Sequence, residues 1–234
     1  MTRLQLGDTS VDVVFKDIRN VHLSVHPPSG EVRISAPLNT DLDALRLFAI
    51  SKLGWIKRHQ KRQLGQAREE PREYIERESH YLWGRRYLLR LWESSRAAVE
   101  VGHRHIDLFV QPAASTEKRR EVLESYYRSE LRDKASKFIQ KWEKQLGVNA
   151  SKFFVQKMKT KWGSSNPAAR NIRLNLELAK KDIDCLDYIV LHELTHFIEP
   201  THSDAFMRIL DSNMPNWRHV KKHLNDLPLC QIGS

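Results

Sequence analysis

The residue types best suited to holding a metal ion lie close together in the C-terminal third of this 234-residue chain. His192 and His196 are four residues apart, so on a helix their imidazoles lie on one face, about one turn apart, and can reach a single cation. Glu193 is next to the first histidine and points near the cation rather than onto it. His202, ten residues after His192, is a third candidate ligand. Three nitrogen ligands with one open position are typical of catalytic zinc sites.

Pro200 gives the third histidine a way to reach the other two, because a proline ends the helix and lets the chain fold back. We therefore predict a metal centre of His192, His196 and His202 that holds one Zn2+ per chain, although nickel, cobalt or iron suit the same ligands. Two other interpretations stay open. The histidines could be partly buried residues of an amphipathic helix, or the zinc could be purely structural, although the sequence contains no cysteine cluster.

The elements around these histidines follow from the spacing of apolar residues. They are expected in this order: a strand over residues 153–162, a tight turn at 163–167, a half-buried antiparallel strand over 171–178, a helix over 182–198, and short helices over 204–210 and 217–224. The second strand rests on an unbroken alternation of polar and apolar residues. Asp182 or Asp184 is expected to cap the histidine-bearing helix.

The earlier part of the chain predicts further strands and helices, which together indicate an α+β fold. The expected elements are strands at residues 21–25 and 31–36, a helix from residue 42 that continues into a basic stretch and a linker near 63–71, two or three short strands within 78–92 and 97–110, and a helix over 116–146 that Gly147 stops. We expect two domains, residues 1–70 and residues 71–234, the first a strand-and-helix region.

The composition is that of a folded chain without a membrane segment. Hydrophobic residues make up 40% of the sequence, with 6 Trp, 6 Tyr and 8 Phe, which excludes disordered, collagen-like and coiled-coil classes. No apolar run approaches the roughly 18–20 residues needed to span a bilayer. The first residues become polar too early for a secretory signal, and the two cysteines do not suggest a disulfide framework. We expect a soluble cytoplasmic protein with no membrane partner.

The charge balance is strongly basic, with 39 Lys and Arg against 29 Asp and Glu and a net charge of +10. Such a balance favours solubility and attraction to polyanions but says little about the fold. One group of basic residues, Lys157, Lys159 and Lys161, lies just before the histidines, on one face of the strand predicted there. The spacing of the basic residues matches no known nucleic-acid-binding module.

The C-terminal third resembles the YgjP-type metallopeptidases, also called minigluzincins, which are zincins related to SprT-like proteases. The likeness rests on the segment Lys-Thr-Lys-Trp-Gly-Ser-Ser at residues 159–165, on residues 172–175 and 188–196, and on His202-Ser203 followed by Phe206. Residues 30–37 and Trp55-Ile56 also look like the leading region of the family, so the likeness covers most of the chain. One departure is Ser165, where the family has cysteine, which argues against an essential thiol at this position.

This resemblance implies that residues 71–234 form a zincin-like metallopeptidase domain of antiparallel strands and an active-site helix. It implies that His192, His196 and His202 hold zinc and that Glu193 is the general base. The expected activity is hydrolysis of peptide bonds in a peptide or protein, by water that zinc and Glu193 activate. Candidate substrate-binding residues are Trp162, Lys159 and Lys161, although Trp162 also suits a core or cleft wall.

The sequence also offers candidates for pairing with an extended substrate and for stabilising the oxyanion. An extended substrate could pair with the strand at residues 171–178 or at 158–162. The group that stabilises the oxyanion could be Tyr188, Arg170 or a backbone N–H near Gly163.

Three alternative functions stay open. A metal-dependent hydrolase of phosphoanhydride or phosphodiester bonds in nucleotides would use the basic residues near the site to bind phosphate. A protease acting on nucleic-acid-bound proteins would bind the nucleic acid through its basic surface. A non-catalytic binding module would keep the metal fold without turnover. If Lys157, Lys159 and Lys161 lined the metal site as a row, the nucleotide-hydrolase hypothesis would be favoured.

Overall fold

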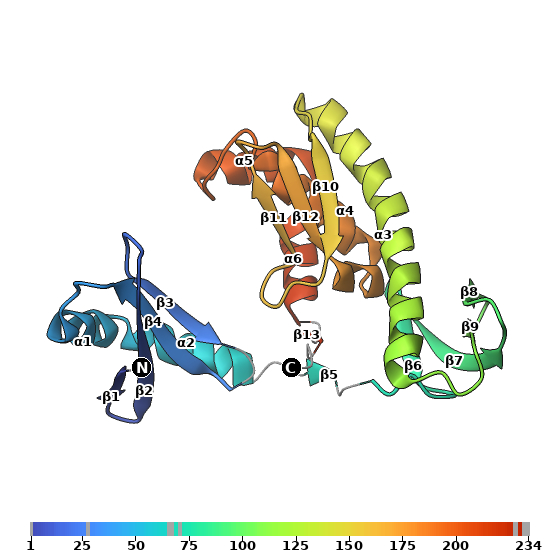
Figure 1. The fold of residues 1–234 in the computed structure, drawn as a ribbon. Helices are drawn as coiled ribbons and strands as arrows, with labels where there is room; N and C mark the ends of the chain where they lie inside the picture. The colour runs from blue at the N-terminus through green and yellow to red at the C-terminus, as the bar shows by residue number, and fades with distance from the viewer. Residues whose placement is uncertain (1, 27–28, 65–67, 70–71, 227–228, 231–234) are drawn as a thin grey trace. The chain divides into compact units, whose positions relative to one another are not determined.

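A computed structural model describes residues 2–26, 29–64, 68–69, 72–226 and 229–230. The chain divides into two compact units, Met1–Glu70 and Pro71–Ser234. Each unit combines helices with small sheets, which confirms the predicted α+β class (Figure 1). Two strands of two residues each, β5 (Arg68–Glu69) and β13 (Leu229–Cys230), complete the list of strands in the described residues. No helix in the described residues combines the length and apolar character needed to cross a membrane.

The N-terminal unit contains a four-stranded sheet of order β1-β2-β4-β3. Its strands are β1 (Thr2–Leu6), β2 (Thr9–Lys16), β3 (His22–His26) and β4 (Glu31–Pro37). The sequence predicted only the last two. The signal for β2 was present, because Val11 and Val13 alternate with polar residues and are both buried.

Two helices, rather than one long helix, pack against this sheet. They are α1 (Leu42–Ser51), capped by the Asp41 side chain, and α2 (Leu53–Leu64). Lys52 separates them with φ −105° and ψ 3°, outside the helical range, and its N–H bonds to the carbonyls of Ala49 and Ile50. The core of the unit is formed by Leu4, Leu6, Val11, Val13, Val32, Ile34, Ala36, Leu45, Ala49 and Ile56.

The C-terminal unit contains a three-stranded mixed sheet of order β10-β12-β11. Its strands are β10 (Lys152–Gln156), β11 (Gly163–Asn166) and β12 (Asn171–Asn175). β12 is central, parallel to β10 and antiparallel to β11. The tight turn predicted at 163–167 was wrong, because Gly163–Asn166 form β11. Two strand predictions were also wrong: the strand expected at 153–162 ends at Gln156, and the antiparallel strand expected at 171–178 ends at Asn175.

Asn175 explains both corrections. Its side-chain oxygen accepts the N–H of Glu177 at 3.2 Å and caps the 3-10 helix η1 (Leu176–Lys180), so the strand cannot continue. Its side-chain NH2 donates to the carbonyls of Met158 at 2.9 Å and Lys161 at 2.8 Å. These bonds hold residues 157–162 as a loop around the buried amide.

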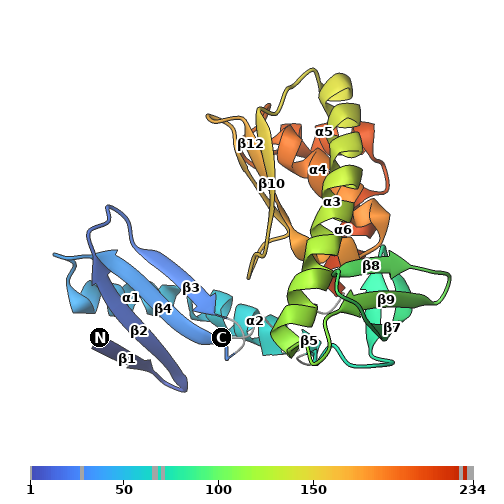
Figure 2. The ribbon, with the colours of Figure 1, turned by 45° about the vertical axis from the view of Figure 1, so that its right-hand side comes forward.

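Four α-helices lie on one face of this sheet, as Figure 2 shows. They are α3 (Thr116–Leu146), α4 (Ile183–Thr195), α5 (Asp204–Asn213) and α6 (Trp217–Asp226). Gly147 ends α3 in the left-handed conformation at φ 67°, as predicted. The indole N–H of Trp142 in α3 donates to Asp187 in α4 at 2.5 Å, and this bond ties the two longest helices together.

The helix that carries the histidines is shorter than the predicted range of 182–198. It ends at Thr195 because the N–H groups of Phe197 and Ile198 bond three residues back, to Leu194 and Thr195, both at 3.0 Å. Such bonds tighten the last turn and stop the α-helix before Pro200. Asp182 is the N-cap residue but makes no side-chain cap bond, and its carboxylate lies 2.5 Å from His223 Nε2 in α6 instead.

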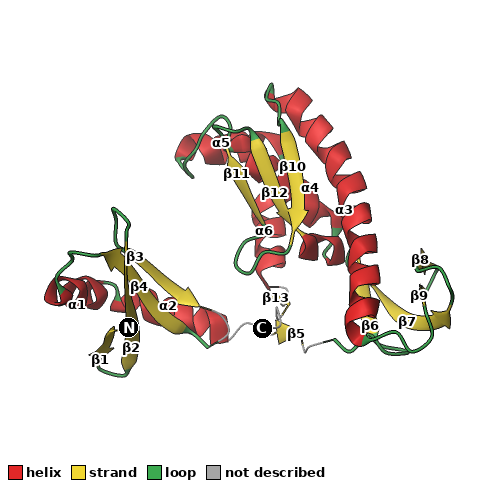
Figure 3. Ribbon diagram, viewed as in Figure 1, coloured by secondary structure: helices red, strands yellow, loops and turns green. Residues whose placement is uncertain are grey.

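A second sheet of the C-terminal unit, of order β6-β7-β9-β8, packs against the first part of α3 (Figure 3). Its four strands are β6 (Ser79–Leu82), β7 (Arg85–Glu93), β8 (Ala98–Val101) and β9 (His105–Val110), where two or three were predicted. The turn between β6 and β7 contacts the start of α4. Trp83 N–H donates to the Ala179 carbonyl at 2.9 Å, and a Cβ on Gly84, which has φ 75°, would lie 1.6 Å from Asp182 Oδ1.

The buried His80 of β6 predicts how the stability of the C-terminal unit depends on pH. Its side chain is 1% exposed and lies 3.0 Å from Glu78 Oε2. Burial, followed by the charge of Arg72, lowers the pKa of His80 from 6.5 to about 4. The unfolded chain therefore binds more protons between these two values, and stability present above pH 6.5 is lost as the pH falls towards 4. The full effect is up to about 3 kcal/mol.

Urea unfolding followed by tryptophan fluorescence tests this expectation, since five of the six Trp lie within residues 71–234. Between pH 7 and pH 4.5, H80Q should lose less stability than the wild type, and the control variant H103Q should lose as much as the wild type. Equal losses in the wild type and H80Q would contradict the role of His80.

Candidate active site

Three histidines converge at the C-terminal end of α4. His192 lies in its last turn, His196 is the residue that follows it, and His202 lies in the loop before α5. One ring nitrogen from each lies within 4.8 Å of the other two. The Nε2 atoms of His192 and His202 are 3.0 Å apart. In tetrahedral geometry two nitrogens bound to one zinc ion would be roughly 3.3 Å apart, so the three rings are arranged as a metal centre requires.

The loop that brings His202 back is shaped by hydrogen bonds. The Glu199 carboxylate accepts from the Thr201 hydroxyl at 2.8 Å, and the Ser203 hydroxyl caps α5 by accepting the Phe206 N–H at 3.3 Å. The Glu199 carbonyl lies 3.2 Å from Nδ1 of His196. A proton on this Nδ1 donates to the carbonyl and leaves the lone pair of Nε2 for the metal centre. The orienting group is therefore a backbone carbonyl.

Apolar and aromatic side chains support the three imidazoles. Phe206 of α5 is fully buried, and its ring centroid lies 5.0 Å from His192 and 4.8 Å from both His196 and His202. Tyr188, one turn before His192, lies with its ring edge-on to that imidazole at 5.8 Å and stacks on Trp217 of α6 at 6.1 Å. These contacts restrict how the rings can rotate.

Burial keeps these imidazoles in the form that binds metals. It lowers the pKa of His192 to about 3, with the neighbouring His196 as the second cause, and it also lowers the pKa of His196. At neutral pH both rings are therefore uncharged and carry a free lone pair, as ligation requires. Nδ1 of His192 is buried and has no hydrogen-bond partner among the described residues. The donor set, three imidazole nitrogens, suits a divalent metal such as zinc.

Glu193 is nearly fully buried, at 5% exposure, between α4 and the sheet. The Ser165 side chain of β11 lies close to its carboxylate. Burial raises the pKa of Glu193 to about 7, and the Ser165 hydrogen bond and the charge of Lys161 oppose this rise. A carboxyl group whose pKa lies near neutrality can both accept and release a proton.

The three predicted substrate-binding residues occupy different settings. Trp162 is half-buried against the core, with Lys181 Nζ 5.9 Å from its ring centroid. Lys159 and Lys161 are exposed and lie in the loop of residues 157–162. The predicted lysine row on one strand face is therefore wrong, because these residues form no strand and Lys157 pairs with Glu124 of α3. Of the three lysines, Lys161 lies close enough to Glu193 to affect its pKa.

The three candidates for oxyanion stabilisation lie in different parts of the C-terminal unit. Tyr188 is 3% exposed and packs beneath Trp217, whereas Arg170 is exposed at the end of the β11–β12 hairpin opposite Gly163. The backbone of β11 near Gly163 is the candidate that adjoins Glu193. Sequence reasoning gave no role to Asn175 and took Ser165 only as a departure from a pattern. Asn175 stands at a polar position of the alternation, so the pattern gave no signal for its role.

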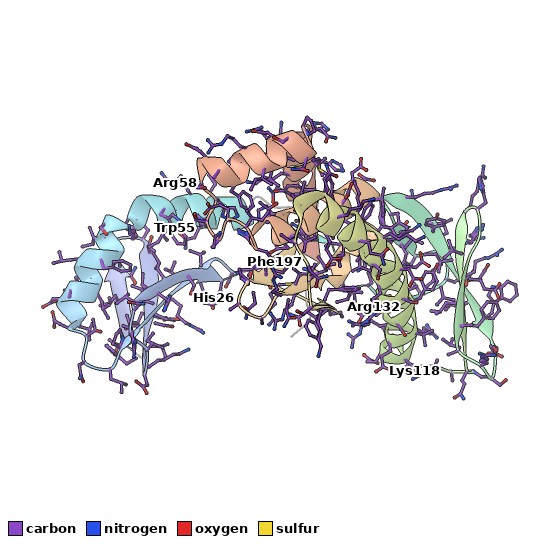
Figure 4. The ribbon with its side chains drawn as sticks, turned by 90° about the horizontal axis from the view of Figure 1, so that it is seen from above. His26, Trp55, Arg58, Lys118, Arg132 and Phe197 are labelled. Atoms are coloured by element: carbon purple, nitrogen blue, oxygen red, sulfur yellow. The ribbon has the colours of Figure 1, made fainter. Side chains whose placement is uncertain are left out.

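The remaining basic residues are distributed over several elements. Figure 4 shows Arg58 projecting from α2, and Lys118 and Arg132 projecting from α3. Other lysines are neutralised locally, for example Lys141 by Asp187 at 2.8 Å and Lys180 by Glu177 at 2.9 Å. The net charge of +10 therefore does not mark one binding surface.

Comparison with protein families identifies the kind of centre that these residues form. The model of the YgjP-like metallopeptidase domain matches residues 19–227, which is most of the chain. The chain belongs to the YgjP-like family. This family of metallopeptidases implies a divalent metal, usually zinc, and the histidine triad is close enough to hold one. No curated protein matches this YgjP-like chain.

Solved structures similar to the chain include two metallopeptidase zymogens. The first is abylysin of Pyrococcus abyssi, with 18% identity, a TM-score of 0.36 and coverage of 38% of this chain and 90% of that one. The second is jannalysin of Methanocaldococcus jannaschii, with 24% identity, a TM-score of 0.35 and coverage of 38% of this chain and 86% of that one.

The geometry of the triad predicts the metal content of variants. The wild type purified without an affinity tag should contain close to one zinc per chain by mass spectrometry. H202A should lose most of this metal, because two imidazoles remain where three converge. H219A, which removes an exposed histidine of α6, is the matched control and should keep its zinc. A wild type that stays empty after dialysis against zinc would contradict the metal centre.

Proposed function

We propose that this chain is a zinc-dependent peptidase that hydrolyses peptide bonds in peptide or protein substrates. The proposal rests on the convergence of three imidazoles beside a buried carboxylate in a chain of a metallopeptidase family. His192, His196 and His202 would hold the zinc ion, and Glu193 would act as the general base. A zinc ion held there would polarise the substrate carbonyl and make water more acidic.

Glu193 would carry the proton through the reaction. Its carboxylate would accept a proton from the attacking water and pass it to the nitrogen of the leaving amine. Burial favours this role, because a carboxylate out of bulk water interacts strongly with a charge that develops beside it. Ser165 and Lys161 favour the charged form of the carboxylate, which offsets part of the cost of burying it.

β11 is the best place for the backbone of an extended substrate. The central strand β12 is paired on both sides and cannot take a substrate, and residues 157–162 form no strand, so neither segment expected from the sequence suits this role. β11 has β12 on one side only within the described sheet. An extended peptide on its open edge would form backbone hydrogen bonds and lie beside Glu193, as substrates do in zincin-like enzymes.

Family membership favours the peptidase over the alternatives. The nucleotide-hydrolase hypothesis depended on a lysine row along a strand, and that row is not formed. A protease acting on nucleic-acid-bound proteins, or a binding module that holds metal without turnover, would use the same triad. DNA-stimulated cleavage would support the first of these, and a Glu193 variant with unchanged properties would support the second.

The E193Q variant tests the peptidase proposal. Zinc-loaded full-length protein is incubated with an unstructured protein such as casein and, in parallel, with nucleoside triphosphates, and products are measured by mass spectrometry. Casein cleavage in E193Q should fall by roughly 100- to 10,000-fold, because the amide cannot accept the proton. Its zinc content should not change.

The matched control is E117Q, which alters an exposed carboxylate in the first turn of α3 and should cleave casein like the wild type. Cleavage of nucleotides without cleavage of casein, or full casein cleavage by E193Q, would contradict the proposal.

A further inference from the structure

The face of β11 that meets α4 carries two small residues, Gly163 and Ser165. They are two positions apart, so they lie on the same side of the strand. β11 packs directly against α4, and the side chain of Glu193 lies between the two elements. The edge strand of the sheet is therefore in contact with the carboxylate that the proposed reaction uses.

Gly163 is the closest point of this contact. A Cβ placed on it would lie 2.6 Å from Oε1 and 2.9 Å from Cγ of Glu193, and 2.9 Å from Cγ2 of Ile189. Real Cβ atoms essentially never make contacts below 3.0 Å, so any other residue at position 163 must displace a neighbouring atom. The backbone of Gly163 does not have positive φ. The glycine is therefore required here for space and not for its conformational freedom.

The atoms around Gly163 differ in how easily they can move. Ile189 precedes Glu193 by one helical turn, is 6% exposed and has a stiff branched side chain. Helix α4 itself packs against α3, α5, α6, β11 and β12, and this packing resists a rigid-body shift of the helix. The Glu193 side chain makes two of the three closest contacts, including the shortest, and is the most flexible of these neighbours, so it is the group that moves most easily.

Ser165 lies on the same face of β11 and close to the same carboxylate. Its hydroxyl favours the charged form of Glu193, whose side chain is almost fully buried. Ser164, the residue between the two, points to the opposite face of the strand. The same face of β11 therefore leaves space for the Glu193 side chain at Gly163 and carries a hydroxyl group at Ser165.

We propose that β11 is the positioning element for Glu193, with Gly163 leaving the space that the carboxylate occupies and Ser165 fixing its direction. This inference rests on the proposed function of Glu193 as the general base. Gly163 and Ser165 are positioning residues, because they act on the reaction through Glu193. The same strand then aligns the substrate along its open edge and the base along its inner face.

Variants of β11 in the zinc-loaded, full-length protein test the inference. A displacement of about 1 Å in a reacting group costs on the order of 100-fold in rate. In G163A, kcat on casein should therefore fall about 100-fold, with KM and zinc content close to the wild type. In S165A, kcat should fall about 10-fold. S164A, on the opposite face of the strand, should match the wild type and is the control.

Two readouts separate positioning from general damage to the fold. In the E193Q background, G163A should cause no further loss, because both changes remove the same contribution. A crystal structure of G163A should show the Glu193 carboxylate moved while His192 and His196 stay in place. If G163A does not fold, the corresponding structure and double variant of S165A provide the test.

The outcomes distinguish this inference from the proposed function. The inference would be overturned if G163A and S165A both had wild-type kcat. It would also be overturned if Glu193 had not moved in the crystal structure of G163A, or if G163A lowered kcat in the E193Q background as much as in the wild type. If E193Q itself keeps full activity, the proposed base role fails. In that case the crystal structure of G163A still decides whether β11 fixes the carboxylate.

Discussion

The burial of α4 on almost every side is the constraint that shapes the C-terminal unit. A buried helix must find a partner for each polar group it carries, because an unpaired buried group costs free energy. Asp187 receives the Trp142 indole and Asp182 lies against His223, so α3 and α6 each fix one position along the helix. The same burial keeps His192 uncharged and places Glu193 against β11. The burial of α4 therefore determines both how the helices pack and which chemical properties the site residues have.

The sequence predicted the convergence of the three histidines better than it predicted the sheet. Four-residue spacing and a proline after the helix are local signals, and they were enough to indicate that His192, His196 and His202 could meet. The order and direction of strands depend on contacts between distant segments, so alternation at residues 171–178 did not show that β12 is central and partly parallel. The strand ends where the Asn175 amide binds the loop before β11, and no periodicity reports such a bond.

The environment of Glu193 was also beyond sequence patterns. Gly163 followed Trp162 in a segment that was assigned to a turn, and a glycine in a turn is usually explained by its backbone freedom. Its actual requirement is the volume that Glu193 occupies, which becomes visible only when the strand is placed against the helix. For the lysines before β11 the pattern was misleading. The regular spacing of Lys157, Lys159 and Lys161 predicted one face of a strand, but these residues lie in a loop.

The docking of the β6–β7 turn on the start of α4 has a consequence for how the protein is made. Gly84 and Asp182 are 98 positions apart in the chain, yet Gly84 has no room for a side chain against Asp182. Contacts between such distant segments form late, because a long loop must close first. During synthesis the N-terminal unit and the hairpin leave the ribosome well before the histidines do. The metal centre is therefore assembled late, once the C-terminal segments that carry the histidines and Phe206 have been made.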